Sequence, residues 1–231
     1  MKLNKEMIGI IAGAAVFASH AQAEIPLTDD LSAYGYIDMW ADSLDSEGKA
    51  DYGVQEIELG FAFTPVDSPF SAVFELSFDG AGNFSGGEDL NVESETVTVT
   101  YTYSDELSFT VGNILSYQGF ETFDATGLYQ YSYSGLGGAV IYSAGYAFGA
   151  SADYVTEDYA AGFWIGDNDG EPSIEVLLAY TGVEDLTVKF IYADDPGYES
   201  INLWAAMTMD RSHLLLSITM MSKLVMLSPS T

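Results

Sequence analysis

Apolar and polar residues alternate along most of this chain with a period of two, and very little of it follows the 3.6-residue period of a helix. The clearest segment is residues 70–79, FSAVFELSFD. One face of this segment carries Phe70, Ala72, Phe74, Leu76 and Phe78, and the other carries Ser71, Glu75 and Asp79. Alternation of this kind is typical of a strand with one apolar face. The pattern therefore predicts an all-β fold.

The same alternation recurs along the chain and predicts about eleven strands. Most are close to the roughly 9–11 residues with which a tilted strand crosses a bilayer. The predicted strands are residues 31–42, 55–64, 70–79, 92–103, 107–114, 136–142, 146–155, 160–167, 173–180, 186–194 and, as the weakest pattern, 201–206.

The connections between these segments indicate the architecture. Short turns are predicted at residues 64–69, 104–106, 143–145 and 181–185, which begin 40, 39 and 38 residues apart (104−64, 143−104, 181−143). Longer acidic, glycine-rich connections lie between them. Short turns at one end and longer loops at the other are typical of an up-and-down antiparallel transmembrane β-barrel, here of eleven or twelve strands. The spacing predicts the next short turn near residue 220. A soluble β-sandwich is the alternative.

Aromatic residues flank the predicted short turns. They are Phe63, Phe70, Tyr103, Tyr142, Tyr146 and Tyr180. Tyrosine and phenylalanine at strand ends are what the interfacial girdle of a membrane barrel requires.

Residues 1–23 have the three-part layout of a secretory signal peptide. Lys2 and Lys5 precede an apolar run, and Ala21-Gln22-Ala23 forms the cleavage site. Residues 24–206 form the predicted barrel body. Residues 207–231 are methionine-rich, lose the alternation and end without an aromatic residue, so we expect an atypical tail and a barrel incomplete at its C-terminus. The predicted location is the outer membrane of a Gram-negative-type bacterium.

Composition excludes several kinds of chemistry. The chain has no cysteine, and its two histidines, His20 and His213, lie outside the predicted body. Disulfides, thiolate metal sites and His-dependent catalysis are therefore not expected. With 6 Lys+Arg against 35 Asp+Glu, the formal net charge is -29, which excludes nucleic-acid binding. We predict no enzyme activity, no catalytic residue, no metal and no cofactor.

Acidic residues recur on the polar faces of the predicted strands. In a barrel these faces line the lumen, where carboxylates favour cations over anions. The predicted lumen acids are Asp38, Glu56, Glu58, Glu75, Asp153 and Glu175. The alternative is that these acids chiefly maintain solubility.

Residues 108–135, SFTVGNILSYQGFETFDATGLYQYSYSG, begin as a strand and continue as a long aromatic connection. A loop folded into a lumen is partly buried, which favours aromatic side chains, and glycine permits tight backbone there. Residues 115–134 are therefore predicted to constrict the pore. The candidate constriction residues are Gly119, Glu121, Asp124, Tyr129 and Tyr131. The alternative is an extracellular loop packed on its own aromatic residues.

This stretch resembles the OmpL-like outer-membrane β-barrel porins, through TVGNILSYQGFE and DATGLYQYSYS. Residues 115–119 depart from the proline-containing segment of that family. The resemblance implies passive diffusion of small solutes, and the acids favour cationic or neutral ones. The expected partners are outer-membrane lipid, small solutes and cations, with a homo-oligomer left open. Two alternatives remain: a non-conducting barrel with adhesive or structural loops, and a periplasmic ligand-binding β-sandwich.

Overall fold

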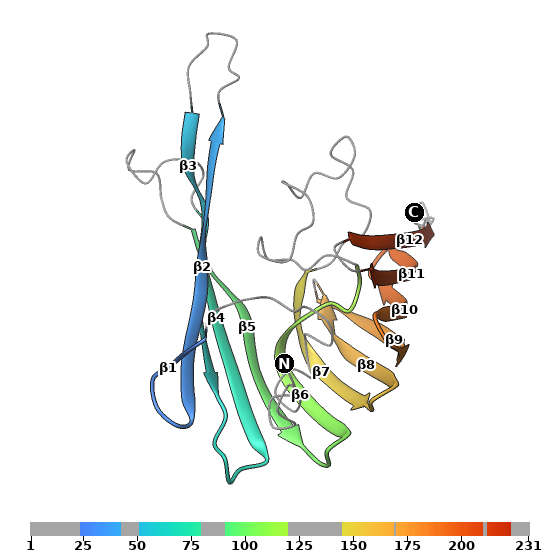
Figure 1. Ribbon diagram of the computed structural model, residues 1–231, viewed down its shortest axis with the longest axis horizontal. Helices are drawn as coiled ribbons and strands as arrows, with labels where there is room; N and C mark the ends of the chain where they lie inside the picture. The colour runs from blue at the N-terminus through green and yellow to red at the C-terminus, as the bar shows by residue number, and fades with distance from the viewer. Residues whose placement is uncertain are drawn as a thin grey trace, which may run out of the picture.

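The structure, a computed structural model, describes residues 24–42, 51–79, 91–119, 145–168, 170–209 and 212–222. These residues form twelve strands in a single sheet, in which every strand pairs with the next one in the chain (Figure 1). The strands are β1 (Ile25–Pro26), β2 (Leu31–Asp42), β3 (Asp51–Phe63), β4 (Phe70–Asp79), β5 (Asn91–Thr102), β6 (Leu107–Leu115), β7 (Tyr146–Val155), β8 (Tyr159–Asn168), β9 (Glu171–Val183), β10 (Leu186–Asp195), β11 (Tyr198–Met209) and β12 (Ser212–Ser222).

Every pairing in this sheet is antiparallel, which confirms the all-β, up-and-down prediction. Strands β2, β4 and β7 match the predicted segments residue for residue, and the other predicted strands that the structure describes differ by up to four residues at an end. Across the described ranges, no helix is long and apolar enough to cross a membrane. The predicted signal peptide, residues 1–23, lies outside them.

The predicted short turns at residues 64–69, 104–106 and 181–185 are confirmed at one end of the sheet, but the predicted short turn at residues 143–145 is wrong. Strands β6 and β7 pair directly along their length, from Leu107 opposite Tyr154 to Leu115 opposite Tyr146. No strand therefore lies between them in the sheet, and the predicted strand 136–142 falls outside the described residues. The short turn after β7 consists of residues 156–158, and it lies at the same end of the sheet as the turns at residues 64–69 and 104–106. Regular spacing misled because β6 and β7 are neighbours in the sheet although 30 residues of the chain connect them (145−115).

The predicted short turn near residue 220 is also wrong, because β12 runs through that position. Strand β11 continues past the predicted boundary at Ala206 and ends at Met209, and β12 then pairs with it over its whole length. The register places Leu214 opposite Met207 and Ile218 opposite Leu203. A strand adjacent to an existing edge gains a full ladder of backbone hydrogen bonds, so it forms without strict alternation.

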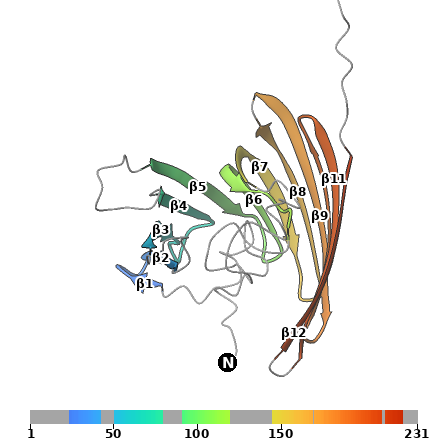
Figure 2. The same cartoon turned by 90° about the horizontal axis from the view of Figure 1, so that it is seen from above.

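The sheet curves into an open arc (Figure 2). Within the described residues it is not closed: β1 and β12 are its two edges, and β1 covers only Ser32 and Ala33 of β2. Strands β2 and β12 both run from the short-turn end to the long-connection end, because Leu31 pairs with Phe63 and Ser212 pairs with Met209. To close the sheet into a barrel with antiparallel pairing throughout, a strand that runs in the opposite direction must lie between β2 and β12. Strand β1 runs in that direction, because it is antiparallel to β2.

The two faces of the arc have opposite chemistry. The outer face exposes large apolar side chains from β2 to β11, among them Met39 (70% exposed), Val99 (53%) and Phe148 (65%). The inner, concave face carries most of the buried polar residues, including Glu58, Asp153 and Glu175. This is the reverse of a water-soluble sheet, whose apolar face is the buried one.

Candidate functional site

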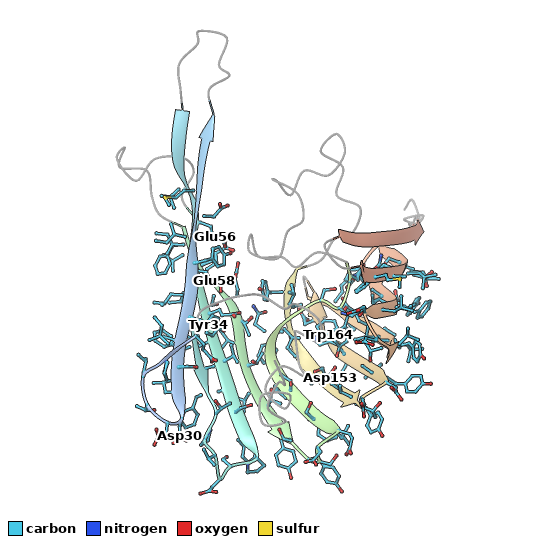
Figure 3. The ribbon with its side chains drawn as sticks, viewed as in Figure 1. Asp30, Tyr34, Glu56, Glu58, Asp153 and Trp164 are labelled. Carbon is cyan, nitrogen blue, oxygen red and sulfur yellow. The ribbon has the colours of Figure 1, made fainter. Side chains whose placement is uncertain are left out.

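The six predicted lumen acids all lie at inner positions of the sheet, in two groups. Asp38, Glu56, Glu58 and Glu75 come from β2, β3 and β4, whereas Asp153 and Glu175 come from β7 and β9. Figure 3 shows Glu56 and Glu58 on one arm of the arc and Asp153 on the other.

Two acids of the first group, Glu56 and Glu75, accept hydrogen bonds from tyrosines of β2 and a serine of β4. The Tyr36 hydroxyl donates to Glu56 Oε2 (2.8 Å), and the Ser77 hydroxyl donates to Glu56 Oε1 (2.7 Å). The Tyr34 hydroxyl donates to Glu75 Oε1 (2.6 Å). Antiparallel register sets Tyr36 opposite Glu58, so its hydroxyl reaches the diagonal neighbour Glu56. Tyr34 lies opposite Gly60, which in turn lies opposite Glu75, so its ring passes over the glycine to reach Glu75.

The second group binds residues 116–119, which we call the strap. The strap follows β6 and crosses the inner face towards β11. Its first two residues bind Glu175: the Ser116 hydroxyl donates to Oε1 (2.6 Å), and the Tyr117 backbone N–H donates to Oε2 (2.7 Å). The Tyr117 hydroxyl donates to Asp153 Oδ1 (2.5 Å), and the Ser151 hydroxyl donates to Asp153 Oδ2 (2.7 Å).

The last two residues of the strap bind β10 and β11. Gln118 donates through Nε2 to Asp195 Oδ2 (3.4 Å) and accepts from the Ser200 hydroxyl at Oε1 (2.7 Å). The Gly119 N–H donates to Asn202 Oδ1 (3.3 Å). The Gly119 carbonyl accepts from the Trp204 indole (3.0 Å). Four consecutive residues thus hydrogen-bond to four different strands, β7, β9, β10 and β11.

Glycines make room for the aromatic rings on this side. A Cβ at Gly162 would lie 2.8 Å from the Tyr117 ring, and a Cβ at Gly166 would lie 2.3 Å from the Trp164 ring. Burial, together with the neighbouring Asp153 carboxylate, raises the pKa of the Tyr117 phenol, which therefore stays protonated and acts as a donor.

Apolar side chains also lie on the inner face beneath the strap. Leu177, Ile191 and Trp204 form a buried cluster against which Tyr117 packs. The Lys189 ammonium lies 5.2 Å from the centre of the Trp204 ring, a cation–π geometry. Lys189 is the one Lys or Arg that the described ranges contain. This part of the inner face is therefore a packed core rather than a uniformly polar lumen wall.

Exposed aromatic residues gather on the outer face at the short-turn end. Phe63, Phe70, Tyr103 and Tyr159 are all exposed there, and Tyr180 packs against Tyr159 with ring centres 5.2 Å apart. One of the predicted girdle residues is wrong, and one is untested. Tyr146 begins β7 and so lies at the opposite end, and Tyr142 falls outside the described residues.

Of the five predicted constriction residues, the structure describes only Gly119, which is buried in the strap. Glu121, Asp124, Tyr129 and Tyr131 lie outside the described residues. The sequence analysis missed Tyr117 and Gln118 as site residues. Their signal was present, since both belong to the polar-aromatic run directly after the strand, but their partners lie far away in the sequence.

Within the described ranges, no three His, Cys, Asp or Glu side chains form a group that could hold a metal ion. Comparison of the chain with protein-family models and with curated proteins finds no match. The functional interpretation therefore depends on the geometry of the two faces.

Proposed function

We propose that this protein is an outer-membrane β-barrel porin that lets small, preferentially cationic or neutral solutes diffuse passively. The observation that carries the proposal is the reversed sheet: large apolar side chains are exposed on the outer face, while carboxylates are buried on the inner face. An apolar band of this extent is suited to lipid acyl chains, and the aromatic residues at its short-turn edge are suited to the membrane interface.

Closure of the arc into a barrel belongs to this proposal. In lipid, an unpaired strand edge is too costly to persist, because its backbone groups have no water to bind. Curvature of the sheet supports closure, and β1 provides the direction that antiparallel closure requires. The similarity of residues 108–135 to OmpL-like porins is consistent with this function, as is a preference for cations at an inner face rich in acids.

The periplasmic β-sandwich gains little support, since a sandwich needs a second sheet to cover its apolar face. All twelve strands in the described ranges belong to one sheet. A non-conducting barrel with adhesive loops is the second candidate. It is favoured by the strap and the apolar cluster of Leu177, Ile191 and Trp204, which fill part of the inner face.

A planar-bilayer recording tests the proposal. Residues 24–231 are refolded in detergent and inserted under a salt gradient. We expect discrete conductance steps whose reversal potential has the sign of cation preference. Protein that is membrane-inserted and heat-modifiable on a gel, yet passes no current, would instead identify the non-conducting barrel. Protein that stays in solution without detergent would support the sandwich.

The constriction hypothesis has its own test within this assay. Glu121→Gln removes one carboxylate from the connection that follows the strap. A reversal potential equal to that of the unmodified protein would remove Glu121 from the constriction, whereas a shift towards zero would place it there.

A further inference from the structure

The inner face of the arc is divided into two sides of different accessibility. We call the inner positions of β7–β11 the closed side, and the inner positions of β2, β4 and β5 the open side. Figure 3 shows that Tyr34 and Glu58 belong to one arm of the arc and that Asp153 and Trp164 belong to the other.

The closed side is covered along a continuous row of residues. The register links Ser151, Trp164, Glu175, Ala193 and Ser200 across five neighbouring strands. None of these five side chains is more than 5% exposed. The strap binds two of them directly, Glu175 through Ser116 and Ser200 through Gln118. A solute moving along the inner face therefore meets the strap before it meets this wall.

The two acids of the closed side, Glu175 and Asp153, accept hydrogen bonds from the strap and from Ser151. Both oxygens of Glu175 accept bonds from the strap, and the two oxygens of Asp153 accept from Tyr117 and Ser151. Their exposure is 4% and 2%. Carboxylates held in this way position the strap and have no free oxygen directed at a passing ion.

The open side has partly exposed polar residues at its inner positions. Asp38, Ser71, Glu75 and Thr98 are all half-buried. Glu56 and Glu58, on β3 between β2 and β4, are instead buried, at 7% and 2% exposure. No Lys or Arg is present in β2, β3, β4 or β5. The negative potential of these carboxylates is therefore not cancelled by a basic residue of the same strands.

We propose that solutes pass along the open side only, and that cation preference is set there by Asp38 and Glu75. Asp153 and Glu175 are then positioning residues for the strap rather than selectivity residues. This inference rests on the proposed porin function and goes further, because it locates the path and assigns different roles to acids that the sequence presents as equivalent.

Thiol labelling tests the division, and the absence of native cysteine makes each introduced thiol unique. Ser71→Cys on β4 samples the open side, and Ser173→Cys on β9 samples the closed side. Ser173 is 1% exposed, and its hydroxyl has no hydrogen-bond partner among the described residues, so its replacement breaks no such bond. The full chain is refolded in detergent, and a charged thiol reagent then reaches both ends of the protein.

We expect Ser71→Cys to react at least about tenfold faster than Ser173→Cys, because the rate depends on access of the reagent to the thiol. Adding Tyr117→Ala to Ser173→Cys should raise its rate towards that of Ser71→Cys, because the strap loses its bond to Asp153. In bilayers, the reagent should reduce the current through Ser71→Cys and leave that through Ser173→Cys unchanged.

If the two cysteine variants label at equal rates and the protein conducts, the division of the inner face into an open and a closed side is overturned, and the porin function is retained. If the two cysteine variants label at different rates but the unmodified protein passes no current, the porin function is overturned, and the proposed solute path with it. A fall in current after labelling of Ser173→Cys alone would place the path on the opposite side from the one proposed.

Discussion

The Tyr117 hydroxyl donates a 2.5 Å hydrogen bond to Oδ1 of Asp153, across 36 positions of the chain. Tyr117 lies in the strap directly after β6, and Asp153 lies on the inner face of β7. The bond therefore fixes the start of the long connection against the wall of the sheet. Asp153, which the sequence predicts to be a lumen acid, therefore binds the strap through Tyr117.

Tyr117→Phe tests the contribution of this bond. The substitution leaves a buried carboxylate oxygen without its donor, so the free energy of unfolding should fall by about 1–3 kcal/mol. Urea unfolding of the detergent-refolded protein measures the change. Tyr34→Phe is the matched control, since it removes a similar bond to the half-buried Glu75 and should cost less. Equal losses in the two variants would show that the Tyr117 bond has no special role.

Gly162→Ala tests the packing beneath the strap. The new methyl group would lie 2.8 Å from the Tyr117 ring, so the ring must move, and overpacking of this kind typically costs about 1–3 kcal/mol. Gly145→Ala is the control, because nothing lies within 4 Å of a Cβ at that position. We expect a lower urea midpoint for the first variant only. An unchanged midpoint for Gly162→Ala would mean that the ring does not rest on β8.

Val99→Arg tests whether the outer face meets lipid. Val99 is exposed on β5. If this face met water, an arginine at this position would leave the free energy of unfolding unchanged. Near a bilayer midplane, the same arginine would lower it by about 2–4 kcal/mol. Val66→Arg, in the turn after β3, is the exposed control and should be tolerated. Folding into liposomes, followed by urea titration, measures both. If Val99→Arg proves as stable as Val66→Arg, the apolar face does not lie in a membrane.

Glu75→Gln tests the selectivity assigned to the open side. The amide keeps an oxygen that accepts from Tyr34 but removes one charge, so the cation-to-anion permeability ratio should fall by roughly twofold to fivefold at low salt. Reversal potentials under a salt gradient measure the ratio. Asp185→Asn neutralises an exposed turn carboxylate and should leave it unchanged. A shift of equal size in both variants would indicate a general effect of net charge.

The strands and the chemistry of their faces could be predicted from the sequence. Residues 70–79 alternate so regularly that β4 begins and ends where expected, and Glu56 and Glu58 lie on the inner face as expected. The succession of turns could not be predicted, because the length of the β6–β7 connection has no periodic signal. Strand β12 was missed because it pairs with β11 through its backbone and does not depend on alternation.

The sequence by itself therefore determined the strands from β2 to β11 and which side of each is polar, since side chains of an extended backbone alternate with a period of two. Only the tertiary structure decided which acids bind the strap and which remain partly exposed. Contacts such as Trp204 with Gly119, 85 positions apart, depend on the register of several strands and on the curvature of the sheet. No local pattern encodes either of these, so Asp153 and Glu75 look alike in the sequence and differ in the fold.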